Sequence, residues 1–307
     1  MAPGIEVRLE AWPASDEPRL VVDAHDFGER HELPDAGVFK QRHALLAAAI
    51  GAASTAPDRA YHLHVRSGVP PGASTGSSAA VVVAVLAAFD AMAGEPLSPA
   101  SLARRAHEVE VQSLGLESGV QDQIAAAYGG ANFIEMPRYP ETLVEPLLLG
   151  AATREALDQR LLLVYLGRGH DSSAVHRQVI ASLVAGGGQR QALEGLRALA
   201  WQGRAALLAG DLAAYGLALS ANCDQQAALH PSLVSDVAAR VIGVARAHGA
   251  TGWKVNGAGG DGGSLTVLCG VGPEARAVQA RQVEAEVPGV RALPVTLSPH
   301  GVQLRAT

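Results

Sequence analysis

The stretch "VPPGASTGSSAAVVVAVLAAFDAM", Val69 to Met92, joins a turn rich in glycine and serine to an apolar segment. The composition of that segment predicts a helix from Ala79 to Met92. The turn before the helix has two interpretations. Unpaired N–H groups at a helix start, with the positive end of the helix dipole, can hold a polyphosphate. The glycines can also simply separate a strand from a buried helix, and this stretch alone favours neither interpretation.

Composition and charge limit the class of protein. The chain has 307 residues, 48% of them hydrophobic, which is enough for two domains with their own cores. The formal net charge is −6 and no long block of lysine and arginine occurs, which argues against a nucleic-acid or membrane surface. The two cysteines, Cys223 and Cys269, lie in dissimilar contexts and indicate thiols of a reduced compartment.

Targeting signals are not evident in the sequence. The N-terminal residues carry charge where a signal peptide needs an apolar segment. No apolar run approaches the roughly 20 residues that a membrane-spanning helix needs. We therefore expect a soluble, cytoplasmic protein.

Strands and helices are expected to alternate along the chain. Ile5–Trp12 and Arg19–Ala24 have the residues of strands, and the turn-rich link between them predicts a hairpin. A helix is expected from Val38 to Gly51, and a strand over Ala60–Pro70. Later helices are expected at 98–115 (capped by Ser98 or Ser101), 119–128, 174–219, 231–250 and 274–287, and later strands at 131–136, 160–167, 264–268 and 290–297. This order predicts an α+β fold with a domain boundary near residue 155.

A second stretch, "AHEVEVQSLGLESGVQDQIAAAYGG", contains two acids of interest. Glu110 lies inside one predicted helix and Asp122 at the start of the next. A phosphoryl transferase needs a carboxylate for Mg²⁺ and often another to orient or deprotonate the attacking hydroxyl. The alternative is that both are ordinary solvent-facing acids, although Asp122 is unusual in lying between two glutamines in small, apolar surroundings.

A third stretch, "KVNGAGGDGGSLTVL", is dense in glycine before a strand, with Gly257, Gly259, Gly260, Gly262 and Gly263. This density costs conformational entropy and favours a close approach of the backbone to a ligand or another loop. A dinucleotide-binding loop is the competing interpretation. That loop opens a helix after a strand, whereas here a strand follows the glycines.

Together and in this order, the three stretches resemble the GHMP kinase superfamily of galactokinase, homoserine kinase and mevalonate kinase. Residues 71–80 resemble its Pro-x-x-x-Gly-Leu-Gly-Ser-Ser-Ala motif, slightly shifted, and residues 254–262 resemble its Lys-x-x-Gly-Ala-Gly-Gly-Gly-Gly motif. Residues 119–130 are similar to the Gly-x-Gln-Asp-Gln-x-Ala-Ala-Ala-x-Gly-Gly stretch of bacterial D-glycero-D-manno-heptose 7-phosphate kinases. The resemblance covers nearly the whole chain.

The resemblance implies a two-domain GHMP kinase fold. Residues 1–155 would form a ribosomal protein S5 domain 2-like N-terminal domain, and residues 156–307 a ferredoxin-like C-terminal domain. The implied activity is ATP- and Mg²⁺-dependent phosphorylation of a hydroxyl of a sugar, a sugar phosphate or a cyclitol. We expect these small molecules as the only partners, without nucleic acid or membrane, and a monomer or homodimer.

The resemblance also implies roles for individual residues. Asp122 would be the catalytic residue that holds or deprotonates the acceptor hydroxyl. Glu110 would bind Mg²⁺ together with Ser77 or Ser78. The implied contacts to the ATP phosphates are Pro71, Gly72, Ala73, Ser74, Thr75, Gly76, Ser77, Ser78, Gly257, Gly259 and Gly260.

The sequence departs from the superfamily in three places. Ser74 and Thr75 replace Gly-Leu, and Asp261 replaces a glycine; an acid near a polyphosphate is unfavourable unless it points away or meets a cation. The first superfamily motif, an Arg-Ala-Pro-x-Arg strand and glycine-rich turn that binds the sugar, is absent. Either Met1 is not the true start, or this branch binds its acceptor differently.

Two rival functions stay open from the sequence. One is a non-catalytic nucleotide- or partner-binding protein on the same scaffold, which the altered loop favours and the two acids oppose. The other is a kinase for a non-sugar acceptor such as an amino acid or isoprenoid alcohol, which the Gln-Asp-Gln stretch opposes.

Two further groups of polar residues are weaker candidates for a site. His62 and His64 alternate on a predicted strand as a metal pair would, but no third ligand is evident nearby, so no metal is expected there. Arg168, His170, Asp171 and Ser172 form a polar turn that is either a substrate contact or a solvated loop.

Overall fold

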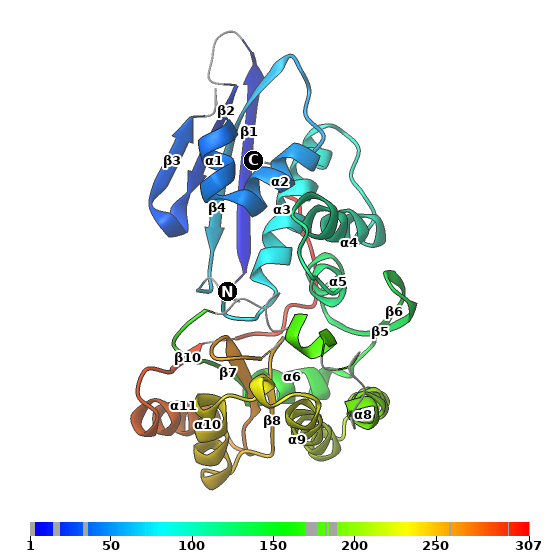
Figure 1. Cartoon of the computed structure of the whole chain (residues 1–307), viewed down its shortest axis with the longest axis vertical. Helices are drawn as coiled ribbons and strands as arrows, with labels where there is room; N and C mark the ends of the chain where they lie inside the picture. The colour runs from blue at the N-terminus through cyan, green and yellow to red at the C-terminus, as the bar shows by residue number, and fades with distance from the viewer. Residues whose placement is uncertain are drawn as a thin grey trace. The chain divides into compact units, whose positions relative to one another are not determined.

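A computed structural model of the chain describes residues 4–14, 19–32, 36–70, 72–169, 177–181, 183, 189–257, 259–293 and 295–306. These residues fall into two compact units (Figure 1). Of the described residues, 4–70, 76–144 and 298–306 form the N-terminal unit, and 72–75 with 145–297 form the C-terminal unit. The predicted His170, Asp171, Ser172 and Pro71 lie outside the described residues.

The N-terminal unit is built on a four-stranded sheet in the order β1-β4-β2-β3. Its strands are β1 (Ile5–Pro13), β2 (Leu20–Ala24), β3 (Glu29–Glu32) and β4 (Arg59–Ser67). The predicted hairpin between the first two strands is wrong, because β4 lies between them, antiparallel to β1 and parallel to β2. Tyr61, Leu63 and Val65 of β4 are buried in the core, which explains why this strand takes a central place in the sheet.

Helices cover the face of this sheet that carries Tyr61, Leu63 and Val65 (Figure 1). They are α1 (Ala36–Arg42), α2 (Ala44–Ala52), α3 (Ser77–Met92), α4 (Pro99–Glu108) and α5 (Gln121–Tyr128), and a π-helical turn, η2 (Val109–Ser113), continues α4. The helix predicted from Val38 is in fact two helices with a break at His43. Helices α3, α4 and α5 begin within two residues of their predicted starts. Ser98 caps α4 by accepting a hydrogen bond from the Ser101 N–H at 3.2 Å.

The helix α3 is the most deeply buried of these elements. Buried residues lie on several sides of it, among them Val82, Val83, Leu86 and Phe89, each at most 1% exposed. A helix that is apolar on all sides is stable only inside a core. The apolar run of the opening stretch therefore anchors the glycine turn that precedes it.

The last described residues belong to the N-terminal unit. After α5 the chain passes through Gly129 and Gly130 into β5 (Ala131–Arg138), which pairs with β6 (Glu141–Leu147). The Gly130 N–H donates to the Ser298 carbonyl at 2.9 Å, and a Cβ on Gly129 would lie 2.0 Å from the His300 carbonyl carbon. Residues 298–306 thus pack on the end of α5, although they were expected in the C-terminal domain.

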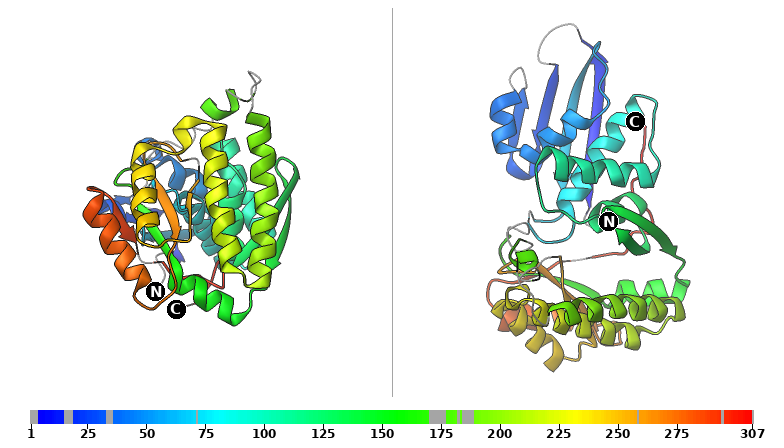
Figure 2. Two further views of the ribbon diagram at one scale, coloured as in Figure 1. Left: turned by 90° about the horizontal axis from the view of Figure 1, so that it is seen from below. Right: turned by 45° about the vertical axis from the view of Figure 1, so that its right-hand side comes forward.

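The C-terminal unit contains a four-stranded antiparallel sheet in the order β10-β7-β9-β8. Its elements are α6 (Ala151–Arg160), β7 (Leu161–Tyr165), α8 (Gln189–Ala209), α9 (Leu212–Leu229), η3 (Pro231–Leu233), α10 (Asp236–Ala247), β8 (Gly252–Val255), β9 (Ser264–Leu268), α11 (Ala275–Glu286) and β10 (Arg291–Leu293). Helices α8 and α9 lie side by side as an antiparallel pair (Figure 2). From β7 onward the described elements follow the β-α-β-β-α-β order of ferredoxin-like folds, with helices α8, α9 and α10 between the first two strands.

The predicted domain boundary near residue 155 falls inside α6. Leu157 of this helix packs with Leu212 and Leu268 in one apolar cluster. The division between the compact units therefore lies earlier, between Val144 and Glu145. Every helix in the described part of the chain is too short or too polar to cross a bilayer.

Candidate active site

The start of α3 is suited to binding an anion. Gly76 precedes the helix with φ of +69° and provides no side-chain cap. The first turn holds Ser77, which is partly buried, and Ser78, which is exposed. Backbone N–H groups of a first helical turn have no partner within the helix, and the helix dipole adds positive potential there. This turn can therefore bind phosphate oxygens through backbone N–H groups and serine hydroxyls.

Asp122 lies beside this helix start. It occupies the first turn of α5 and is exposed. A Cβ placed on Gly76 would lie 3.2 Å from both Cβ and Cγ of Asp122. Glycine at position 76 is thus required both by its positive φ and by the nearness of the aspartate. The fold brings a carboxylate to the place where the sequence predicts phosphates.

Glu110 is the second predicted acid and has different surroundings. It lies on η2 and is only 6% exposed. Its Oε2 accepts a hydrogen bond from the Ser118 hydroxyl at 2.6 Å, and Gln123 Nε2 donates to the same hydroxyl at 3.3 Å. Burial raises the pKa of Glu110, the hydrogen bonds from Ser118 and Gln123 lower it, and the charge of Asp122 raises it.

The second carboxylate oxygen of Glu110 is suited to bind a cation. Its Oε1 is buried and has no hydrogen-bond partner among the described residues. A buried acceptor without a partner costs about 1–3 kcal/mol, and more when charged. Carboxylate and hydroxyl oxygens are the ligands that Mg²⁺ prefers. Glu110, with the hydroxyls at the start of α3, therefore has the donor chemistry that Mg²⁺ requires.

The position of Glu110 along the helix explains why it is buried. It follows the buried residues Ala103 and Ala106 at helical spacing, so it lies on the same side. The helix that begins at Ser98 changes to π-helical geometry at Val109. A π-helical turn shifts the side chains that follow it around the helix axis, and such turns are frequent at functional sites.

The residues before Gly76 lie against the glycine-rich loop in the C-terminal unit. Ser74 has a positive φ of +54°, which is unfavourable for a residue with a side chain. A Cβ on Gly257 would lie 3.4 Å from Ser74 Cβ. Ala73 is fully buried. The turn 72–75 is therefore packed against the loop that the sequence predicts to brace it.

Backbone geometry explains the glycine density of that loop. Positive φ angles occur at four of its glycines: Gly257, Gly259, Gly260 and Gly263. At Gly262 the reason is space, because a Cβ there would lie 2.6 Å from the Arg168 carbonyl oxygen.

Asp261, which replaces a glycine of the superfamily motif, meets a cation. Its carboxylate lies 3.0 Å from Arg168 Nη2, and both side chains are exposed. Arg168 also holds the loop through its carbonyl, which accepts from the Gly263 N–H at 2.9 Å. The polar turn after β7 thus contributes a partner for the unusual acid.

Two site residues were missed from the sequence. Ser118 donates to the Glu110 carboxylate and Gln123 donates to the Ser118 hydroxyl, and neither residue has a role in the predicted site. Gln123 is only 1% exposed, although its neighbours Gln121 and Asp122 are exposed. The signal that could have found it is its spacing from Ile124 and Ala127, which share the buried side of α5.

Comparison with known proteins identifies part of this architecture. Residues 40–130, which carry α3, Glu110 and Asp122, match the family "GHMP kinases N terminal domain". This segment is therefore similar to the N-terminal domain of GHMP kinases. The resemblance expected from the motifs is confirmed here.

Relatives of the GHMP kinase domain include sugar-phosphate kinases. The chain is 28% identical over 205 residues to the D-glycero-alpha-D-manno-heptose 7-phosphate kinase of Campylobacter jejuni. That match covers 66% of this chain and 59% of the relative, so less than two thirds of the relative is spanned. A mevalonate kinase of Methanothermobacter thermautotrophicus is 37% identical over 76 residues, which is 25% of each protein.

Solved structures share the fold of this GHMP kinase-like chain. A D-glycero-D-manno-heptose 1-phosphate kinase from Bacteroides thetaiotaomicron aligns with a TM-score of 0.72 and 21% identity, over 98% of this chain and 88% of that one. The mevalonate kinase of L. major in complex with R-mevalonate aligns with a TM-score of 0.74 and 21% identity, over 96% and 87%. The predicted α+β GHMP kinase fold is therefore confirmed.

Proposed function

We propose that this protein is a kinase that uses ATP and Mg²⁺ to phosphorylate a hydroxyl of a sugar, a sugar phosphate or a sugar-like cyclitol. One observation carries the proposal: the buried, unpartnered oxygen of Glu110 and the exposed carboxylate of Asp122 occur in one unit with the helix start at Gly76. The Glu110 oxygen suits a cation, the Asp122 carboxylate can accept a proton, and the helix start suits phosphate. The kinase relatives support the same reaction class.

The roles follow from these surroundings. Glu110 and the hydroxyl of Ser77 or Ser78 hold Mg²⁺, which neutralises phosphate charge when it is bound. Backbone N–H groups of 72–78 bind the phosphates of ATP. Asp122 orients the acceptor hydroxyl and takes its proton, while the acceptor oxygen bonds to the γ-phosphorus and the bond to the ADP oxygen breaks. Gly257, Gly259 and Gly260 let the loop pack closely against the turn at Ser74. Positioning and charge neutralisation supply most of the rate enhancement.

A sugar-like acceptor is supported by how much of the chain is similar to a sugar-phosphate kinase and how much to a mevalonate kinase. Similarity to a heptose 7-phosphate kinase extends over 66% of this chain, whereas similarity to a mevalonate kinase extends over 25% of it. The presence of both acids argues against a non-catalytic scaffold. The alternative is a non-sugar acceptor, and the experiment must distinguish it from a sugar-like acceptor.

The test is ADP release from Mg²⁺-ATP with a panel of free sugars, heptose phosphates, cyclitols, mevalonate and homoserine. We expect turnover with a sugar-like member of the panel and a phosphorylated product in the mass spectrum. Turnover with mevalonate or homoserine alone would refute the acceptor class. ATP binding without turnover on any acceptor would refute the kinase and favour a nucleotide-binding protein.

A further inference from the structure

The face of the N-terminal sheet opposite the helices carries a group of imidazole and carboxylate side chains. His62 and His64 alternate with the core residues Tyr61, Leu63 and Val65 along β4, so both imidazoles lie on the other face. Both rings are partly buried, and their centroids are 3.9 Å apart. The two histidines that the sequence showed as a pair are thus a close pair in space.

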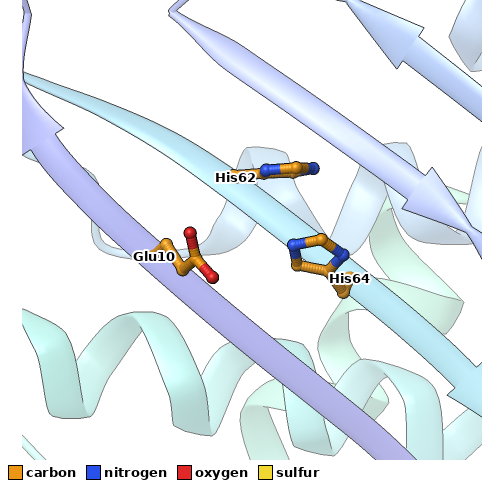
Figure 3. Close-up of side chains that lie close together, drawn as sticks. All are labelled: Glu10, His62 and His64. Carbon is orange, nitrogen blue, oxygen red and sulfur yellow. The ribbon is translucent and has the colours of Figure 1, made fainter. Parts of the chain in front are cut away.

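The neighbouring strands supply the third ligand that the sequence did not reveal. Glu10 of β1 is the register partner of His62, and Asp23 of β2 is the register partner of His64. One ligand atom each from Glu10, His62 and His64 lie within 4.8 Å of one another. Figure 3 shows Glu10 on its strand facing the two rings of β4. The expectation that no third ligand lies near the two histidines is therefore wrong. The third ligand, Glu10, comes from another strand.

Asp23 determines which ring nitrogens are available. Its Oδ2 lies 2.9 Å from Nε2 of His62 and 3.1 Å from Nδ1 of His64. Nδ1 of His62 and Nε2 of His64 are the other nitrogens, and Figure 3 shows one nitrogen of each ring on the side of Glu10. A carboxylate that binds one nitrogen of a histidine while the other binds metal is the usual outer arrangement of zinc sites.

The charges around the group are compatible with a cation. Arg8 pairs with Glu10 at 2.5 Å and Arg30 with Asp23 at 3.6 Å. The Arg8–Glu10 pair is between exposed side chains, and pairs of this kind contribute little stability. A divalent cation can therefore displace Arg8 from Glu10.

We propose that Glu10, His62 and His64 bind a divalent cation of the Zn²⁺ class, with Asp23 as the positioning residue for both imidazoles. Two neutral imidazoles and one carboxylate are a ligand set for Zn²⁺ rather than for Mg²⁺, which prefers oxygen ligands alone. Three protein ligands leave the fourth tetrahedral position to water. The ion would link β1 to β4 directly, and β2 through Asp23.

A second histidine group in the same unit provides a matched control. His31 and His43 both direct Nε2 to one oxygen of Glu29, at 3.1 and 2.8 Å, and Arg42 contacts the other oxygen. The Glu29 carboxylate is therefore already shared by two imidazole rings and a guanidinium group. No further acid is part of this histidine group.

The first experiment is a titration of the nucleotide-free protein with Zn²⁺ against a chromophoric chelator. We expect one saturable site, which His64→Gln removes and Glu10→Gln weakens at least tenfold; Asp23→Asn should weaken it about 10–100-fold. Glu10→Gln changes an exposed side chain and keeps the test valid if a histidine variant fails to fold. Glu110→Gln and His31→Gln should leave the site unchanged.

The second experiment replaces Zn²⁺ by Co²⁺. Binding at this site should produce the visible absorption of tetrahedral Co²⁺, and His62→Gln should abolish it. Equal Zn²⁺ affinity in the parent, Glu10→Gln and His64→Gln proteins would overturn the proposal. Loss of binding in His31→Gln, with binding kept in His64→Gln, would also overturn it and assign the ion to the Glu29 group.

Discussion

Asp122 and Glu110 are two carboxylates of one unit in opposite surroundings. Asp122 is exposed beside Gly76, whereas Glu110 is buried and holds Ser118. An exposed acid can exchange protons with an acceptor, and a buried acid with an unsatisfied oxygen is suited to a cation. The two residues therefore allow separate tests.

Asp122→Asn is expected to lower kcat about 10²–10⁴-fold, because the amide cannot accept the proton of the hydroxyl. ATP binding should be largely unchanged, since the proposed phosphate ligands are the backbone N–H groups at the start of α3. Steady-state kinetics and equilibrium binding of ATP measure the two effects. The nearby exposed acid Glu117 gives the control Glu117→Gln, which should keep full activity. An Asp122→Asn protein with parental kcat would contradict the assigned role.

Glu110→Gln is expected to increase the Mg²⁺ concentration that activity needs, because it removes a ligand charge. Without Mg²⁺ it should also change the pH dependence of stability. The pKa of Glu110 is raised in the folded protein. The free energy of unfolding of the parent therefore falls as pH rises from the usual glutamate pKa through the raised one. The Glu110→Gln variant has no ionisable group at this position and does not lose stability in this way.

The measurement is urea unfolding of both proteins in EDTA across that pH window. The free energy of unfolding of Glu110→Gln, relative to the parent, should rise with pH until the parent carboxyl is fully ionised. A difference between Glu110→Gln and the parent that does not depend on pH would contradict the inferred burial cost.

Among the elements, the loop from Gly257 to Gly263 depends most on glycine. Gly259 combines a φ of +63° with a Cβ position 2.0 Å from the Leu233 carbonyl oxygen. Gly249 has a φ of +85° with nothing within 4 Å of its Cβ position. The two positions separate backbone strain from steric exclusion.

Gly249→Ala is expected to cost about 1–2 kcal/mol, the strain of a left-handed residue. Gly259→Ala should cost more, at least about 3 kcal/mol, because the added methyl group also displaces backbone. Urea denaturation of the two variants measures the difference in the free energy of unfolding. Equal losses would show that the loop moves freely away from Leu233 and would contradict the close packing at Gly259.

At the scale of the whole molecule, the chain leaves the N-terminal unit and returns to it at its end. Residues 298–306 pack on the end of α5, where Gly129 and Gly130 contact His300 and Ser298. Gly301 is equally crowded, since a Cβ there would lie 2.1 Å from the Ala127 carbonyl oxygen. The last residues therefore complete the packing of a unit whose strands begin at residue 5.

Deleting residues 298–307 is expected to lower the Tm by several degrees, because it exposes the apolar end of α5. Deleting only residues 303–307 should have little effect, since residues 303–306 are exposed. Differential scanning calorimetry measures both. An unchanged Tm after the longer deletion would mean that these residues do not stabilise the N-terminal unit.

The sequence predicts the elements and site residues better than their neighbours in space. The helix start at Ser77, the Ser98 cap and the strand around Leu63 follow from local composition and periodicity. The role of Gln123 and the break at His43 do not, because each depends on what the side chain packs against. Local propensity is a weak guide wherever tertiary contacts decide.

By itself, the sequence determined that a glycine-rich turn precedes a buried helix, that Glu110 and Asp122 follow it, and that a second glycine-rich loop precedes a strand. These are local properties of residue type and spacing. Only the tertiary structure decided that β4 separates β1 from β2, that Asp122 lies beside Gly76, and that Glu10 faces His62 and His64. The physical reason is that strand order and site geometry are chosen by burial of apolar surface between distant segments. Residues far apart in the chain become neighbours only through that packing.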